Sequence, residues 1–111
     1  MIMWYQNVYM DENASKNPQK CMNRVEAVKL WKKSYTLITL PTNAENLFDI
    51  LNSRELLFDY YKRRDMYVLG VAADRESAME LLVYLIDDMM KQSGEFSPRT
   101  FFGRDKFVSR K

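Results

Sequence analysis

The sequence predicts a single small domain of the α/β or α+β class, with a three- to four-stranded mixed sheet, a central parallel βαβ unit and two main helices. Its 111 residues are enough for one domain with its own core. Segment 34–40, which contains β-branched residues, and the apolar segment 66–72 have the composition of strands. Segments 43–62 and 75–92 carry apolar residues at helical spacing. Strand, helix and strand in this order favour a right-handed parallel crossover.

The N-terminal part of the chain is less regular. Segment 2–10, IMWYQNVYM, is rich in aromatic and branched residues and is predicted to be a strand. The polar residues 11–20 include a proline and are expected to form a loop. Segment 21–33 consists of good helix formers, but its apolar residues spread around the helical wheel. We expect a helix there, and a strand stays open as the alternative.

A capping pattern predicts where the first main helix begins. Thr42 and Glu45 stand at the spacing at which each side chain caps the backbone amide of the other. A helix over 43–62 is therefore expected. Asn52 and Glu55 repeat the same spacing. Two helices with a break near Asn52 are consequently an alternative to one continuous helix.

The second strand of the βαβ unit is the most apolar part of the chain. Segment 66–72 is apolar on both alternating faces, which is typical of a strand covered on both sides. We expect it to be central and parallel to segment 34–40. Asp74 should cap the helix 75–92, where its charge suits the positive end of the helix dipole.

The expected domain covers residues 1–94, followed by a basic, aromatic tail at 95–111. Apolar residues on the inner faces of the predicted strands and helices should form its core. They are Leu37, Ile38, Leu47, Leu51, Phe58, Val68, Leu69, Val71, Leu82, Leu85 and Met89.

The composition removes many common chemistries. The chain has no histidine, which is the commonest general base and the usual imidazole metal ligand. The single Cys21 cannot form an internal disulfide or a cysteine zinc site, as is typical of a reducing compartment. The two glycine-rich nucleotide-binding patterns, GxGxxG and GxxxxGK(S/T), do not occur in the sequence. We therefore expect no metal and no cofactor, and a non-enzymatic protein rather than an enzyme.

Charge and hydropathy point to the cytoplasm. Seventeen basic and fifteen acidic residues leave a net charge of +2, which is too small to indicate an anionic partner. The N-terminus lacks a basic start followed by a long apolar run, and no stretch of about 18 apolar residues occurs. We therefore expect a cytoplasmic protein that does not associate with a membrane.

Two turns are candidate ligand sites, because ligands of open α/β sheets bind beyond the carboxyl ends of parallel strands. The residues they offer are Thr42, Asn43, Asp74, Arg75 and Ser77. A histidine-free enzyme would have its small-molecule pocket there. Thr42 and Asp74 are equally well explained as helix caps.

Two further groups are candidates for acid-base or nucleophilic chemistry. Asp87 and Asp88 fall on the polar arc of the helix 75–92, where solvated carboxylates keep ordinary pKa values. Cys21 lies near Lys20 and other cations that could lower its pKa, but it has no histidine to activate it. We expect both groups to be catalytically inert.

Basic clusters with neighbouring aromatic residues indicate nucleic-acid binding as an alternative, since cations meet phosphates and aromatic rings stack on bases. Two clusters lie within the predicted domain: Lys29, Trp31, Lys32 and Lys33, and then Lys62, Arg63 and Arg64. The tail adds Arg99, Arg104, Lys106, Arg110 and Lys111. Basic residues also suit helix C-termini, and no recognised nucleic-acid-binding motif is present.

The helix 75–92 has more apolar surface than one sheet can cover. Its polar side chains occupy about 120° of the helical wheel, which leaves an apolar arc of roughly 200°. Met79, Val83, Ile86 and Met90 form the outer part of that arc. We expect the same face of a second copy to bury it. Segment 21–33 and the tail are the intramolecular alternatives.

These features predict a small, non-enzymatic, cytoplasmic binding or assembly module that self-associates as a homodimer. Binding to a different protein is also possible on this interpretation. Nucleic-acid binding through the basic and aromatic clusters is the first alternative, and a histidine-free enzyme is the second.

Overall fold

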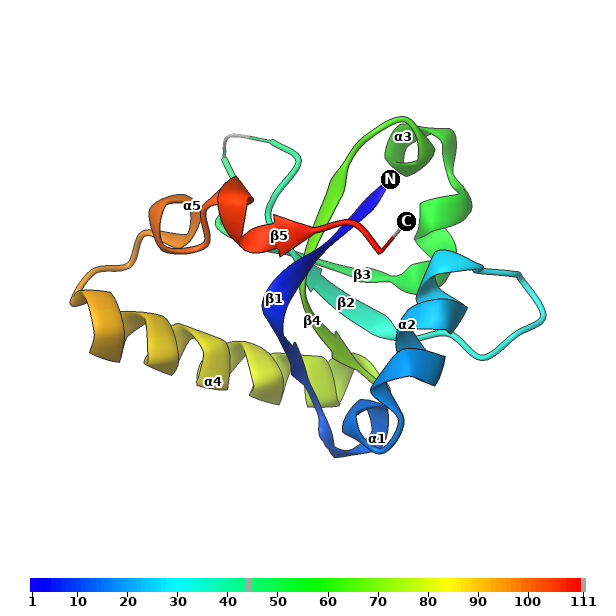
Figure 1. The fold of residues 1–111 in the computed structure, drawn as a ribbon, viewed down its shortest axis with the longest axis horizontal. Coiled ribbons are helices and arrows are strands. Elements are labelled where there is room, and N and C mark those ends of the chain that lie inside the picture. The colour runs from blue at the N-terminus through cyan, green and yellow to red at the C-terminus, as the bar shows by residue number, and fades with distance from the viewer. Residues whose placement is uncertain (44, 111) are drawn as a thin grey trace.

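The computed structural model describes residues 1–43 and 45–110, which form a five-stranded mixed sheet with helices on both faces (Figure 1). The sheet order is β3-β2-β4-β1-β5. Strands β1 and β4 are parallel, and the β1–β5, β2–β3 and β2–β4 pairs are antiparallel. The strands are β1 (Ile2–Met10), β2 (Thr36–Thr39), β3 (Asp49–Asn52), β4 (Met66–Ala72) and β5 (Phe107–Val108).

The described residues also form one long helix and several short helices. They are α1 (Glu12–Ser15), α2 (Pro18–Glu26), the 3-10 helix η1 (Ser53–Leu57), α3 (Asp59–Lys62), α4 (Arg75–Ser93), α5 (Pro98–Phe101) and the 3-10 helix η2 (Arg104–Lys106). No helix in the described part of the chain is long and apolar enough to cross a membrane.

Two hydrophobic clusters lie on opposite faces of the sheet, because neighbouring residues of a strand point to opposite sides. Leu37 belongs to the cluster beneath α2 and η1, whereas its neighbour Ile38 belongs to the cluster beneath α4. Val68 and Leu69 divide between the two clusters in the same way. The structure is thus a three-layer α+β domain. Figure 1 shows α4 along one side of the sheet and α2 on the other.

The predicted central parallel βαβ unit is absent, because β2 and β4 run antiparallel with Leu37 opposite Val71. The chain after β2 turns back as a hairpin and places Ile50 opposite Ile38, so no helix carries it across the sheet. The parallel partner of β4 is the N-terminal strand β1, with Trp4 opposite Val68. The prediction that 66–72 is a central strand is confirmed, whereas its pairing and the three- to four-strand count are wrong.

The predicted helix 43–62 is also wrong. Its first half contains β3, while its second half forms η1 and α3. Ala44 lies outside the described residues. Thr42 caps no helix with Glu45, since its backbone N–H donates to the Asp49 carboxylate over 3.1 Å.

The second capping pattern in this region does form. The backbone N–H of Asn52 donates to Glu55 Oε2 over 2.7 Å, and the Asn52 side chain accepts a hydrogen bond from Arg54 N–H over 2.9 Å. A helical turn therefore begins at Ser53, as the two-helix alternative required, but a strand precedes it. Leu47 and Phe58, predicted core residues, are 56% and 59% exposed because the helix that would have buried them does not form.

The uncertain segment 21–33 is helical only at its start. Asn17 caps α2 by accepting a hydrogen bond from Lys20 N–H, and Pro18 supplies the first helical position. The helix ends at Glu26, and residues 27–35 form an irregular loop. The buried residues of α2 are Cys21 and Val25. Because the helix ends one residue after Val25, the apolar residues of 21–33 form no continuous helical stripe.

The helix predicted at 75–92 is confirmed as α4. The Asp74 carboxylate accepts a hydrogen bond from Ser77 N–H over 2.8 Å, and Gly94 ends the helix in the left-handed conformation at φ 73°. Leu85 and Met89 are fully buried against the sheet, whereas Leu82 is half-buried at the edge of the contact.

The C-terminal residues pack on the same sheet. Phe102 is fully buried and Phe107 is 5% exposed in the cluster beneath α4. Strand β5 extends the sheet beside β1, with Val108 opposite Trp4.

Candidate functional site

The five predicted ligand-binding residues do not line one pocket. Thr42, Asn43 and Arg75 border an open depression of about 510 Å³ along the edge strand β3. Asp74 and Ser77 border a second open depression of about 610 Å³ beside α1. The antiparallel pairing of β2 and β4 separates the two turns, because the carboxyl end of β2 lies beside the start of β4.

The polar groups at these turns already serve local structure. Asn43 Oδ1 accepts a hydrogen bond from Asn46 N–H over 2.9 Å, and Asp49 accepts hydrogen bonds from Thr42. The hydrogen bonds from Ser77 hold the pKa of Asp74 below its ordinary value, as for a carboxylate that caps a helix. The geometry therefore fits turns and caps better than a ligand site.

Asp87 and Asp88, the acidic pair of α4, have separate partners. Asp87 forms an ion pair with Lys91 over 2.9 Å. Asp88 Oδ2 accepts a hydrogen bond from the Tyr9 hydroxyl over 3.0 Å. Burial of the Tyr9 ring, together with that carboxylate, raises the pKa of the Tyr9 hydroxyl. The two carboxylates therefore do not face one common substrate position.

Metal and thiol chemistry have little support among the residues that the structure describes. That part of the chain holds no cluster of three or more metal-ligating side chains. Cys21 is 1% exposed, and burial raises the pKa of its thiol to about 11. Few thiolates are therefore present at neutral pH.

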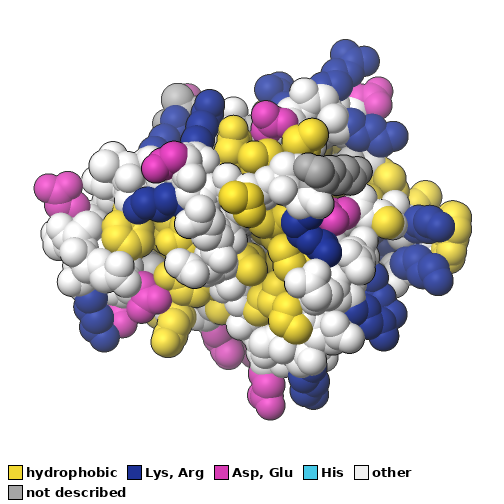
Figure 2. All heavy atoms as spheres, in the orientation of Figure 1, with side chains coloured by type: hydrophobic (Ala, Val, Ile, Leu, Met, Phe, Trp, Pro, Cys, Tyr) yellow, Lys and Arg dark blue, Asp and Glu magenta, His cyan; other side chains and the backbone are white. Residues whose placement is uncertain are grey.

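The two basic clusters predicted within the domain lie at one end of the molecule. Trp31 is 76% exposed in the loop after α2, and the ammonium group of Lys29 lies 5.7 Å from its ring centre. The guanidinium of Arg64 lies 4.2 Å from the ring centre of Tyr60. Figure 2 shows Lys and Arg side chains along the upper right and right of this face, over α3 and the loop after α2. The remaining predicted cations here are Lys32, Lys33, Lys62 and Arg63.

The cations of the tail have structural contacts instead. Arg99 donates a hydrogen bond to the carbonyl of Asn43, and Lys106 donates one to the carbonyl of Phe101. Arg104 stacks on Tyr67, and Arg110 pairs with a carboxylate of α2. Lys111 lies outside the described residues.

The outer stripe predicted on α4 is open to solvent. Met79, Val83 and Met90 are 44%, 67% and 40% exposed. Ile86 is half-buried and packs against the cluster beneath the helix. No element of the described chain covers Met79, Val83 and Met90, which stay exposed in the single chain.

Comparison with known proteins leaves the family open. No family model, curated protein or solved structure matches this chain. A functional conclusion therefore depends on the surfaces of the domain.

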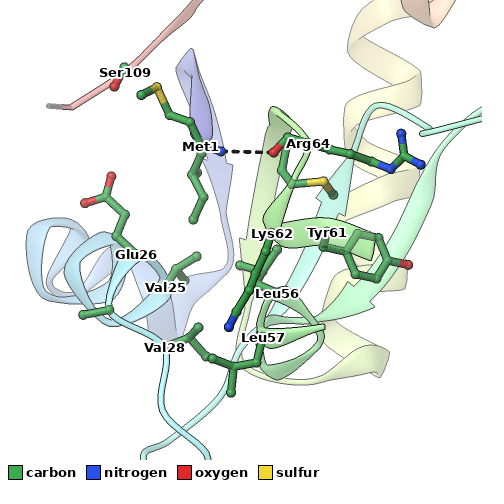
Figure 3. Close-up of a pocket in the computed structure, with 13 residues that line it drawn as sticks. Met1, Val25, Glu26, Val28, Leu56, Leu57, Tyr61, Lys62, Arg64 and Ser109 are labelled. Carbon is green, nitrogen blue, oxygen red and sulfur yellow. Dashed lines mark hydrogen bonds between the residues drawn. The ribbon is translucent and has the colours of Figure 1, made fainter. Parts of the chain in front are cut away.

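One feature was missed from the sequence: an apolar cavity of about 350 Å³ between α2, η1 and the starts of β1 and β4 (Figure 3). Its wall includes Ile2, Val25, Val28, Leu56, Leu57 and Met66. The apolar residues of segments 25–28 and 56–57 gave the only signal. Their meeting depends on the tertiary fold, which local spacing does not encode.

Proposed function

We propose that the protein is a non-enzymatic cytoplasmic assembly module that forms a homodimer through α4. The observation that carries this proposal is the exposure of Met79, Val83 and Met90 on a helix whose other face buries Ala78, Leu85 and Met89. Exposed apolar stripes of this kind are typical of protein interfaces. Methionine side chains adapt well to a helix-to-helix contact.

The arrangement of the stripe favours a second copy as the partner. Read along α4, the order is Met79, Val83, Ile86 and Met90, with intervals of four, three and four residues. This pattern is symmetric about its centre. A two-fold axis there would place Met79 opposite Met90 and Val83 opposite Ile86 of an antiparallel second helix, as a self-complementary interface requires. Antiparallel helices also align their dipoles favourably.

The size of the stripe suggests a weak dimer. From Met79 to Met90 the stripe extends about 16 Å along the helix, and a helix is roughly 10 Å wide. Its area is therefore well below the ~800 Å² per partner of a standard interface. We expect dissociation in the micromolar range, so the dimer should depend on protein concentration.

Light scattering across a concentration series tests the dimer. The wild type should pass from 13.3 kDa towards twice that mass as concentration rises. Val83→Glu should stay monomeric, because a carboxylate without a partner in the apolar contact costs several kcal/mol. Val83 is 67% exposed in the single chain, so this change should leave the fold intact.

Val108→Glu is the matched control, because Val108 is also an exposed valine but lies on β5. It should dimerise like the wild type. A wild-type monomer at every concentration would contradict the proposal. A Val83→Glu dimer would show that another face makes the contact.

Nucleic-acid binding is a second candidate, favoured by the exposed Trp31 among lysines at the basic end. A fluorescence-anisotropy titration with a single-stranded oligonucleotide should show binding that weakens steeply with salt if this function holds. Trp31→Ala should then lose about 1–3 kcal/mol of binding free energy from base stacking. Salt-independent binding, or equal affinity for Trp31→Ala, would contradict it.

Replacing Lys62, Arg63 and Arg64 together by glutamine tests the second cluster. The triple variant should bind the oligonucleotide more weakly and show a shallower salt dependence, because fewer counterions are released. Replacing Arg99 and Arg104 of the tail is the matched control, since these cations have structural contacts.

A further inference from the structure

The cavity between α2 and η1 has the form of a small-molecule site. Its volume of about 350 Å³ lies within the range of ligand pockets. Ile2, Val28 and Leu57 of its lining are half-buried and so present apolar surface to the cavity. A ligand chain entering it would therefore leave water for a fixed apolar wall, which supplies the largest favourable term in binding.

A lysine side chain lies at the mouth of this cavity. Figure 3 shows the Lys62 side chain extending from α3 towards Val28, across the opening. Within the described residues, its ammonium group makes no hydrogen bond and no ion pair. Figure 3 also shows the Arg64 guanidinium pointing away from the cavity, and this group lies 4.2 Å from the ring centre of Tyr60, which is not part of the lining.

The single carboxylate of the lining does not neutralise Lys62. Glu26 accepts a hydrogen bond from the Trp4 indole N–H over 2.8 Å and pairs with Arg110 over 3.0 Å. Figure 3 shows the Glu26 carboxylate turned away from Lys62. Among the described residues, the ammonium group of Lys62 is therefore an unpaired positive charge beside an apolar lining.

We propose that this cavity binds a small, single-chain amphipathic carboxylate, such as a medium-chain fatty acid. The apolar chain lies against Ile2, Val28 and Leu57, and the carboxylate meets the ammonium group of Lys62. A neutral head group would leave the cation without a partner, and a cationic head group would be repelled. The site is independent of the proposed dimer, because α2 and α4 cover opposite faces of the sheet.

Calorimetric titration with decanoate below its micelle concentration tests the site. Affinity should rise roughly fourfold per added methylene in a series from hexanoate to decanoate, until the cavity is full. Lys62→Gln should bind decanoate about tenfold more weakly or worse, because it loses a charge-assisted contact. The methyl NMR signals of Val25 and Val28 should shift on binding.

Arg63→Gln is the matched control, because Arg63 is an exposed neighbour outside the cavity lining. It should bind decanoate like the wild type, whereas decanol should bind the wild type more weakly than decanoate. Four results would overturn the proposal: no binding, equal losses in both variants, equal affinity for decanol, or binding to anionic phosphatidylglycerol vesicles alone.

Discussion

Phe102→Ala should destabilise the domain by about 3–5 kcal/mol, the usual cost of removing a fully buried aromatic side chain. Phe102 is 0% exposed, and its ring contacts Tyr5 edge-to-face with ring centres 5.2 Å apart. The deleted ring would leave a void between the sheet and α4. Such a loss is a large share of the ~5–15 kcal/mol by which a domain of this size is stable.

Urea denaturation followed by circular dichroism measures the effect, with the midpoint falling at an unchanged slope. Phe96→Ala is the matched control, because Phe96 belongs to the same C-terminal part but is 41% exposed. Its ring centre lies 6.3 Å from that of Phe48. Phe96→Ala should lower the free energy of unfolding by about 1 kcal/mol or less. Equal losses in the two variants would mean that the C-terminal residues are not docked as described.

Elements whose local pattern agrees with their tertiary setting were predictable from the sequence. Strand β4 has the predicted bounds because its apolar run is buried on both faces, whatever the direction of its neighbours. Helix α4 was predictable because Asp74 and Gly94 stop the helix at both ends. The partner strands were not predictable, since an apolar strand does not specify which strand lies beside it.

The largest error shows tertiary structure overriding local spacing. The segment around Ile50 and Leu51 has apolar residues at intervals that suit a helix, yet it forms β3. Pairing with Leu37 and Ile38 buries Leu51 to 4% exposure and satisfies backbone groups of both strands. Leu51 was therefore correctly predicted to lie in the core, but for the wrong reason. Leu47, which precedes the strand, was predicted to be buried and is exposed in the structure.

The candidate surfaces divide in the same way. The stripe of α4 was predictable, because it needs only the helical repeat of one segment. The cavity beneath α2 was not, because Val28 and Lys62 come together only after two loops of the chain have been placed.

The thiol of Cys21 should be unreactive in the folded protein. Disulfide cross-links in variants with added cysteines can therefore be assigned to the added residues. It is 1% exposed, and burial raises the pKa of its thiol to about 11. Thiolates attack in disulfide formation, so a buried, protonated thiol reacts slowly. We expect a thiol reagent to label Cys21 only after denaturation. The wild type should consequently form no cross-link under mild oxidation.

The largest effect is expected from cross-linking across the proposed two-fold axis. In an antiparallel pair of α4 helices, Met79 faces Met90 of the second copy, so Met79→Cys combined with Met90→Cys should give a covalent dimer. Met79→Cys alone should stay monomeric on a non-reducing gel, because the two copies of position 79 lie about 16 Å apart along the helices. A disulfide requires Cα atoms roughly 4.4–6.8 Å apart.

The same distance prevents a disulfide within one helix, so the double variant can react only between copies. Val108→Cys, an exposed position on β5, is the control for random collision. A parallel pair of helices would instead link Met79→Cys to itself. That result would keep α4 as the interface but reject the antiparallel arrangement, whereas equal linking of Val108→Cys would reject the interface as well.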